Sequence, residues 1–210
     1  MTPAPKESSL PWPSDPHLRR WMMFVDGENL TIRTQRLAAD NGIKLAVGKH
    51  FMPDTFVWFP GIRGTRAITP GYLELQPHAI RASYYTSLVG DDDRIRTVRE
   101  EIRELGFSPH VFKKHRREDK AKAVDVTLTK DLLVNAFFNN YDVAVLIAGD
   151  GDYVPVVEEL KRLGKVLYLA FYEGYGLSPE LHMASDHFFE MGQEMMRQWA
   201  ATEQNAEGTR

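Results

Sequence analysis

Residues 143–152 read VAVLIAGDGD and begin with an unbroken apolar run that extends through residue 148. A strand without polar residues has both faces covered, which is typical of the parallel sheets in α/β proteins. The carboxylates of Asp150 and Asp152 follow this run directly. Because ligands of open α/β sheets bind outside the carboxyl ends of the strands, the stretch predicts a buried strand that delivers two acidic groups to a ligand-binding edge.

Apolar runs and helical patterns alternate along the chain on both sides of this strand. The expected strands are 21–25, 80–86, 110–112, 143–148 and 166–171. The expected helices are 29–40, a helix capped by 91–93 and ended by Gly106, 122–139 and 152–163. Strands that alternate with helices imply right-handed crossovers. We therefore predict an α/β fold, a three-layer α/β/α sandwich around a mainly parallel sheet of about five strands.

One stretch, 48–78, breaks this alternation. It is rich in aromatic residues, glycine and proline, and we interpret it as an insertion that a β-hairpin would fit. Its aromatic side chains could stack on unpaired bases, or they could form a small core or a dimer surface. A role as a lid or as a homodimer arm stays open. For the whole chain we expect a flexible lead-in over 1–18, a single domain over 19–199 and a flexible tail over 200–210.

Composition narrows the class of protein. The 210 residues include no cysteine, which excludes disulfides and thiolate metal sites and fits a reducing cytoplasm. No stretch approaches the ~20 apolar residues that a membrane helix requires, so we expect a cytoplasmic protein without membrane association. The net charge of −3 is less basic than is usual for a dedicated duplex-DNA binder.

Basic residues are nevertheless concentrated in one segment, 113–122, which carries six lysines and arginines against two acids. A local basic patch can bind phosphates even on a mildly acidic protein. A solvated charged loop is the alternative interpretation. The candidate nucleic-acid-binding residues are Lys113, Lys114, Arg116, Arg117, Lys120 and Lys122.

Two further aspartates are expected at the same edge of the sheet. Asp26 follows the strand 21–25 directly, and Asp125 lies in the first turns of the helix 122–139. Acidic groups that gather at one edge repel each other unless a cation or shared protons compensate. Oxygen-only ligands suit Mg²⁺ or Mn²⁺, and such an ion could activate a water and stabilise the leaving oxygen of a phosphodiester. The candidate metal-binding and catalytic aspartates are Asp26, Asp125, Asp150 and Asp152.

Each of these carboxylates also has a purely structural interpretation. Asp152 could cap the helix that it begins. Asp26 could be a turn residue, and Asp125 could complement the dipole of its helix. We favour a common site because all four aspartates fall at one edge of the predicted sheet.

Polar residues near these aspartates are further candidates. Asn29 lies one turn past Asp26, so its amide could orient a water at the site as part of the catalytic set, or it could cap the first helix. Glu28 is a lesser candidate for the same reason. Asp131 lies six positions beyond Asp125, or ~120° round the helix, so we expect it to support the site from outside or to form an ion pair.

At these residues the chain resembles a known family. The segments FVDGEN (24–29), KAVDVTLTKDLL (122–133) and LIAGDGDYVPVVEELKRLGKVLYL (146–169) are similar to the signature blocks of NYN domains, which belong to the PIN-like nuclease superfamily. The closing stretch 177–191 resembles the LabA-like bacterial branch, although its Ala184–Phe188 segment has one extra residue. The resemblance implies a PIN-like sandwich with an acidic metal pocket and, in active members, RNA cleavage that depends on Mg²⁺ or Mn²⁺.

The resemblance also assigns roles by motif. The four aspartates correspond to the metal-site acids of the family, and Asn29 and Asp131 match flanking positions that its members often share. Lys122 matches the basic residue that often precedes the Val-Asp pair, whereas Ala123 departs from the glycine common there.

Together these features predict a metal-dependent nuclease, most simply an endoribonuclease that acts on single-stranded or looped RNA. The first alternative is a module of the same fold that binds RNA or a protein with little turnover. A Toprim-type enzyme also uses Asp-x-Asp after a strand, but it has no role for the Lys-x-x-Val-Asp helix. An aspartyl-phosphate phosphatase would need Asp-x-Asp after the first strand, where this chain has Asp26-Gly27-Glu28.

Overall fold

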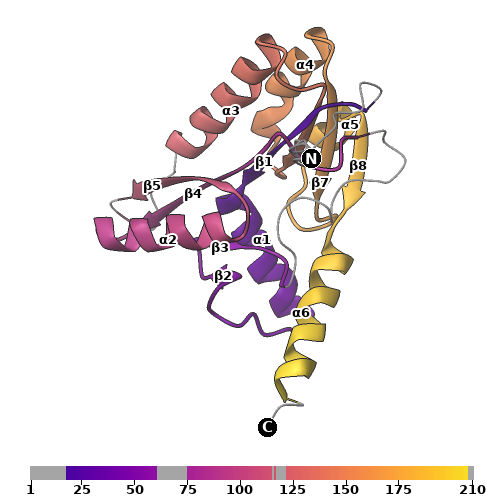
Figure 1. Ribbon diagram of the computed structural model, residues 1–210. Helices are drawn as coiled ribbons and strands as arrows, with labels where there is room; N and C mark the ends of the chain where they lie inside the picture. Colours follow the sequence, from indigo (N-terminus) through magenta and orange to yellow (C-terminus); the bar gives the residue numbers. More distant parts are fainter. Residues whose placement is uncertain (1–17, 61–74, 115, 117–121, 208–210) are drawn as a thin grey trace, which may run out of the picture.

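The computed structural model describes residues 18–60, 75–114, 116 and 122–207. A six-stranded sheet forms the middle of three layers, and helices cover both of its faces (Figure 1). The strands are β1 (Trp21–Asp26), β4 (Arg81–Val89), β5 (Ser108–Lys114), β6 (Val143–Ile147), β7 (Val166–Phe171) and β8 (His187–Glu190). Every neighbouring pair in this sheet is parallel. The predicted α/β/α sandwich is therefore confirmed.

The strand order β5-β4-β1-β6-β7-β8 creates a switch point in the middle of the sheet. From β1 the chain moves outward through β4 to β5, and it then returns to the other side of β1 to form β6, β7 and β8. The connections on the two sides of the β1–β6 boundary therefore diverge. In open α/β sheets, ligands bind at the carboxyl ends of the strands beside such a switch point.

The sheet has one strand more than the predicted five. The additional strand is β8, which pairs in parallel with β7 from Tyr168↔His187 to Phe171↔Glu190. It is short, it lies at the edge of the sheet, and all of its side chains are only partly buried. A strand of this kind lacks the long apolar run that made the central strands recognisable.

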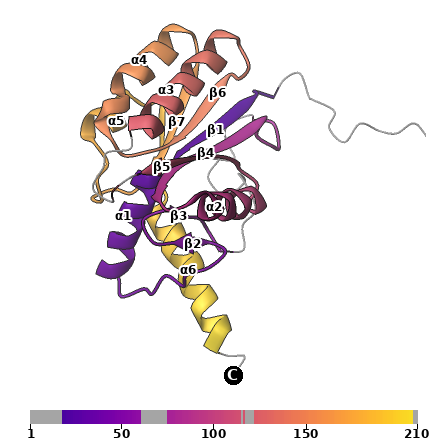
Figure 2. The same ribbon diagram turned by 90° about the vertical axis from the view of Figure 1, so that its left-hand side faces the viewer.

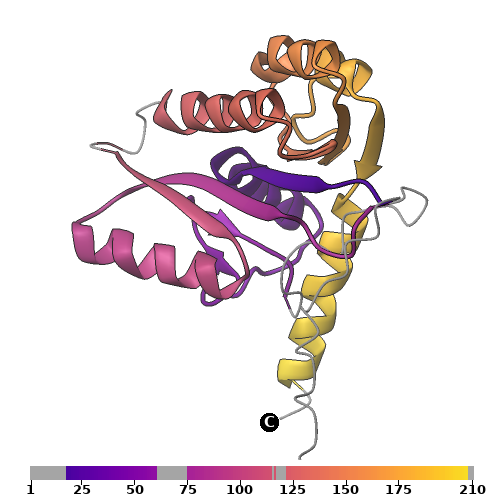
Figure 3. The same cartoon turned by 45° about the horizontal axis from the view of Figure 1, so that its top comes forward.

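The helices divide between the two faces of the sheet (Figures 2 and 3). One face is covered by α3 (Lys122–Phe137), α4 (Val154–Arg162) and α5 (Pro179–Ala184). The other face is covered by α1 (Gly27–Asp40), α2 (Asp92–Glu104) and α6 (Gly192–Glu207). A short 3₁₀ helix, η2 (Gly151–Tyr153), connects β6 to α4. Separate clusters of buried apolar side chains fill the two interfaces.

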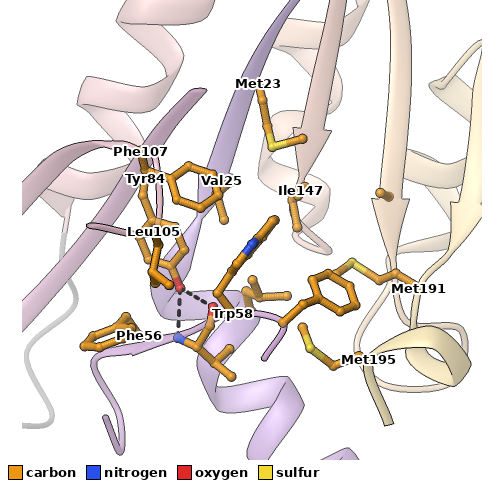
Figure 4. Close-up of a cluster of buried hydrophobic side chains, with 14 of the residues drawn as sticks. Met23, Val25, Phe56, Trp58, Tyr84, Leu105, Phe107, Ile147, Met191 and Met195 are labelled. Atoms are coloured by element: carbon orange, nitrogen blue, oxygen red, sulfur yellow. Dashed lines mark hydrogen bonds between the residues drawn. The ribbon is translucent and has the colours of Figure 1, made fainter. Parts of the chain in front are cut away.

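The insertion at 48–78 contains the expected hairpin, in which β2 (Phe51–Met52) pairs with β3 (Phe56–Val57). The hydroxyl of Tyr84 on β4 accepts a hydrogen bond from the amide of Val57 and donates one to its carbonyl, both at 3.1 Å (Figure 4). The buried aromatic residues of this stretch are Phe51, Phe56, Trp58 and Phe59. The hairpin therefore extends the core, and the alternative in which these four rings stack on bases is wrong. Tyr72 lies outside the described residues.

The C-terminal helix α6 continues through Glu207, so helix occupies part of the segment that we expected to be a flexible tail. Its first turns are anchored because Met195, Met196 and Trp199 are buried against the core. No helix within the described part of the chain is both long and apolar enough to cross a membrane.

Candidate functional site

The last residue of β1 lies at the switch point of the sheet. Asp26 follows Val25, whose partner in the neighbouring strand β6 is Ile147. The chain leaves β6 through Gly149 and Asp150, so Asp26 and Asp150 emerge side by side at the carboxyl edge. The structure thus brings together two aspartates that are more than a hundred positions apart in the sequence.

The Asp26 carboxyl group is buried, with only 4% of the residue exposed. Its Oδ1 atom accepts a hydrogen bond from the Asn29 amide at 3.0 Å and so caps α1. Its Oδ2 atom accepts one from the Tyr153 hydroxyl at 3.0 Å. Burial is the main cause that raises the pKa of Asp26 to about 7, and the nearby charges of Asp125 and Glu28 raise it further.

Asp125 approaches the site from α3. Its Oδ1 atom lies 3.4 Å from the same Tyr153 hydroxyl that donates to Asp26. Desolvation raises the pKa of Asp125, and repulsion from Asp150, Glu28 and Asp152 adds to the increase. Because repulsion falls with distance, this effect on Asp125 indicates that Asp150, Glu28 and Asp152 lie near its carboxylate.

Asp150 and Asp152 lie at the exposed side of this centre. The Oδ1 atom of Asp150 accepts a hydrogen bond from the Asp152 amide at 3.1 Å, so Asp150 is the residue that caps η2. The capping role that we considered for Asp152 therefore belongs to Asp150. The Asp152 carboxylate belongs to the second residue of η2 rather than to a cap.

Asn29 contributes a different contact from the one that we considered. Asp26, and not Asn29, caps α1. The Asn29 side-chain oxygen instead accepts a hydrogen bond from the Gly149 amide at 3.2 Å. This bond ties the start of α1 to the loop that carries Asp150, and it holds the two acidic segments together.

Glu28 is closer to the acidic centre than its position in the sequence suggested. Its charge raises the pKa values of both Asp26 and Asp125. Its side chain accepts a hydrogen bond from the Ser87 hydroxyl at 2.6 Å and forms an ion pair with Lys114. Glu28 therefore connects the acidic centre with the first residues of the basic segment.

The hydrogen bond and the ion pair of Asp131 are made with groups other than these carboxylates. Its Oδ2 atom accepts a hydrogen bond from the Tyr85 hydroxyl at 2.9 Å, and its Oδ1 atom lies 3.2 Å from the ammonium group of Lys130. The Tyr85 ring stacks on His110 with their centroids 4.5 Å apart. Asp131 thus anchors α3 to β4 through Tyr85.

The basic segment begins on β5 beside the acidic edge. Lys114 pairs with Glu28, and Lys113 pairs with Asp92 at 3.2 Å. Arg116 is exposed. Arg117 and Lys120 lie outside the described residues, and for Lys122 only the backbone, at the start of α3, is described.

Two glycines allow the close packing around the site. A Cβ atom on Gly27 would lie 2.0 Å from the Tyr84 ring, and one on Gly149 would lie 2.3 Å from Phe171 and 2.5 Å from the Gly176 carbonyl oxygen. Neither position has room for a side chain. The sequence contains no separate sign that glycine is required at these two positions. It shows only Asp-Gly and Gly-Asp pairs, and the preference of these residues for turns is enough to explain such pairs.

Tyr153 is the site residue that sequence reasoning missed. It is buried, and its hydroxyl lies between Asp26 and Asp125. Burial and the surrounding carboxylates raise its pKa far above the ordinary value, so it remains a neutral donor. The one signal in the sequence was its spacing of three residues from Asp150. About one helical turn separates the two positions, so their side chains are expected on the same face.

The donor chemistry of this centre fits a hard divalent cation, because the available groups are carboxylate oxygens whose mutual repulsion a cation would relieve. Within the described residues, however, no three His, Asp or Glu side chains form a ready-made metal-binding group. Asp150 is engaged in capping, and the Tyr153 hydroxyl joins Asp26 to Asp125. The residues thus fit a cation in chemistry and charge, but in the described part of the chain their side chains do not form a complete set of metal ligands.

The comparisons with known proteins agree with this fold. The family model of the NYN domain matches residues 20–192, and the chain therefore belongs to the NYN domain family. A solved structure of a protein of unknown function from Vibrio parahaemolyticus is similar, with a TM-score of 0.52 and 20% identity over 86% of this chain and 96% of that one. At this identity the likeness shows the fold alone. No curated protein matches the chain.

Proposed function

We propose that this chain is a metal-dependent nuclease, and that it acts as an endoribonuclease on single-stranded or looped RNA. One observation carries the proposal: Asp26, Asp125, Asp150, Asp152 and Glu28 gather at the switch point of a PIN-like sheet, where burial, and then the charges of neighbouring carboxylates, raise the pKa of Asp26 and Asp125. Clustered carboxylates of this kind cost folding free energy, and groups with such raised pKa values are typical of functional sites. Membership of the NYN family supports hydrolysis of phosphodiesters as that function.

The roles of the residues follow from their positions. Asp26, Asp125 and Asp150 would hold Mg²⁺ or Mn²⁺ directly or through water, with Asp152 beside them. A bound cation would polarise the phosphodiester and help an attacking water to lose its proton. Tyr153 holds the Oδ2 atom of Asp26, and Asn29 holds the loop of Asp150, so both act as positioning residues.

The substrate class follows from the charge of the basic segment. Lys114 pairs with Glu28, and in this proposal it would bind the phosphates of the strand together with Lys113, Arg116, Arg117, Lys120 and Lys122 of the same segment. Proteins that recognise RNA mostly bind its single-stranded and looped segments, which favours single-stranded RNA as the substrate in this proposal. Action in the cytoplasm is part of the same proposal.

The test is cleavage of a structured RNA by purified protein with Mn²⁺. We expect Asp150→Asn to abolish cleavage without unfolding the protein, because asparagine also caps helices well. Asp131→Asn is the matched control, since Asp131 binds Tyr85 outside the acidic centre. Equal cleavage by the parent and by Asp150→Asn would remove Asp150 from the proposed site.

One observation favours a second candidate, a binding module with little turnover. No group of three potential ligands is preassembled among the residues that the structure describes. A module predicts that the parent protein binds RNA and does not cut it at any concentration of Mn²⁺. The nuclease predicts cleavage that rises with Mn²⁺ and saturates as the ion binds.

A further inference from the structure

A pocket of about 490 Å³ opens beside the acidic centre and has no assigned role. It is bounded by α1, the turn of the β2–β3 hairpin, the end of β4 and the start of α2. Its lining includes the side chains of Glu28, Ile32, Asp54, Thr55, Ser87 and Arg94. Glu28 belongs to both places, because its charge also acts on Asp26 and Asp125. A ligand in this pocket would therefore lie next to the proposed reaction centre.

The pocket combines apolar walls with a cationic rim. Ile32, Leu88 and Val89 supply apolar surface, and pockets of about 300–1,000 Å³ with such walls suit small planar ligands. Lys114 enters the pocket while paired with Glu28. Arg94 makes no ion pair with any residue that the structure describes, whereas Arg96 pairs with Asp93 at 3.0 Å. Arg94 thus offers a guanidinium group for an anion such as a phosphate.

The polar atoms between these walls act mainly as acceptors. The Ser87 hydroxyl already donates its proton to Glu28 at 2.6 Å, and the Thr55 hydroxyl donates to the Pro53 carbonyl at 3.1 Å. Each hydroxyl has one proton, so only lone pairs remain for a ligand. The Asp54 carboxylate, which accepts a bond from Gln35 at 3.0 Å, is also an acceptor. A ligand that donates protons is favoured, and one that presents carbonyl oxygens to this wall is repelled.

We propose that this pocket binds one unstacked nucleotide of the RNA strand beside the bond that is cut, and that it prefers a base with an exocyclic amino group over uracil. The amino group of adenine, cytosine or guanine would donate a hydrogen bond to the acceptor oxygens of Ser87, Thr55 or Asp54. Arg94 would bind an adjacent phosphate. Uracil has no amino group, and its one N–H on that edge lies between two carbonyl oxygens that these acceptors would repel. This inference rests on the proposed function, which supplies the strand and the reaction centre.

The test measures binding of 5′-AMP and 5′-UMP by calorimetry to the parent protein with EDTA present. The proposal predicts that 5′-AMP binds about tenfold more tightly than 5′-UMP, or about 1.4 kcal/mol. Ile32→Trp should fill the pocket and weaken 5′-AMP binding at least about tenfold. Ile32 is about half exposed, so the larger side chain does not disturb the core. Val134→Trp, at a similarly exposed position toward the far end of α3, should bind like the parent.

The outcomes separate this inference from the proposed function. Absent binding of 5′-AMP, equal binding of the two nucleotides, or unchanged binding by Ile32→Trp would each overturn the pocket assignment. None of these results depends on cleavage or on a cation. Conversely, a protein that binds 5′-AMP in this pocket and never cuts RNA would refute the nuclease and keep the pocket. In a nuclease, Ile32→Trp should also remove the preference for cutting beside amino-bearing bases.

Discussion

The Tyr153 hydroxyl lies 3.0 Å from the Oδ2 atom of Asp26 and 3.4 Å from the Oδ1 atom of Asp125. A phenol has a single proton, so it donates to one carboxylate at a time. The shorter contact assigns that proton to Asp26, the more deeply buried partner. Tyr153 thereby holds the Asp26 carboxyl group at the end of β1 and lies beside Asp125 of α3.

Tyr153→Phe should lower the free energy of unfolding by about 1–3 kcal/mol, because it removes a hydrogen bond to a buried carboxyl group. The loss should grow as the pH rises through 7, where Asp26 becomes ionised and a charged acceptor makes the stronger bond. Urea titrations at several pH values measure the change. Tyr141→Phe is the matched control, since the Tyr141 hydroxyl donates to the neutral Leu132 carbonyl at 2.9 Å. A loss with the same pH dependence in both variants would show that Asp26 is not the partner that matters.

Asp26→Asn should change how stability depends on pH in metal-free protein. The pKa of Asp26 is raised to about 7 by folding, so the folded state keeps its proton while the unfolded state loses it. This contribution is fully present below the unfolded pKa of about 4 and is lost as the pH rises through 7, a decrease on the order of 4 kcal/mol. Asparagine cannot ionise, and the variant should show a flatter profile over that interval. Identical profiles for the parent and the variant would mean that the carboxyl group is not desolvated in this way.

Divalent cations should stabilise the parent protein and lose that effect with the site. If Mn²⁺ binds the ionised carboxylates of the folded state, as proposed, it should raise the Tm in proportion to its binding. Asp125→Asn and Asp150→Asn should each reduce this rise, while Asp131→Asn on the same helix as Asp125 should keep it. Calorimetry with and without Mn²⁺ gives the difference for each variant. An equally small rise in Tm with Mn²⁺ for Asp131→Asn and Asp125→Asn would contradict binding of the ion at the acidic centre.

Gly149→Ala should be strongly destabilising, by several kcal/mol, because its methyl group would overlap the Phe171 ring and the Gly176 backbone. Gly151→Ala, two residues further, would meet only the Ser178 side chain at 2.9 Å, and a side chain can move. Thermal unfolding of the two variants compares them directly. The packing account fails at this position if Gly149→Ala is no less stable than Gly151→Ala.

The central part of the fold could be predicted because its signals are local and strong. The apolar runs that end at Asp26 and before Asp150 fixed two buried strands, and strand–helix alternation placed their carboxyl ends at one edge. The capping role of Asp91 was also predicted, and its side chain accepts a bond from the Arg94 amide at 2.8 Å. These features depend on neighbours in the sequence, which is why periodicity reveals them.

The remainder depends on contacts between distant segments. Nothing near Tyr153 in the sequence indicates that its hydroxyl reaches Asp26, and nothing near Glu28 indicates that it binds Ser87 and Lys114. The strand β8 was missed because a short edge strand needs no apolar run. The carboxylate of Asp186 likewise joins distant segments, since it accepts a hydrogen bond from the Leu167 amide at 2.8 Å and pairs with Lys161.

The most direct measurement is the anomalous difference density of Mn²⁺ in crystals of the parent protein soaked with that ion. The proposal predicts a peak within coordination distance of Asp125 and Asp150, next to Asp26 and Asp152, at the carboxyl ends of β1 and β6. Soaked crystals that hold Mn²⁺ elsewhere and leave these four aspartates without a peak would contradict the metal site and the nuclease built on it.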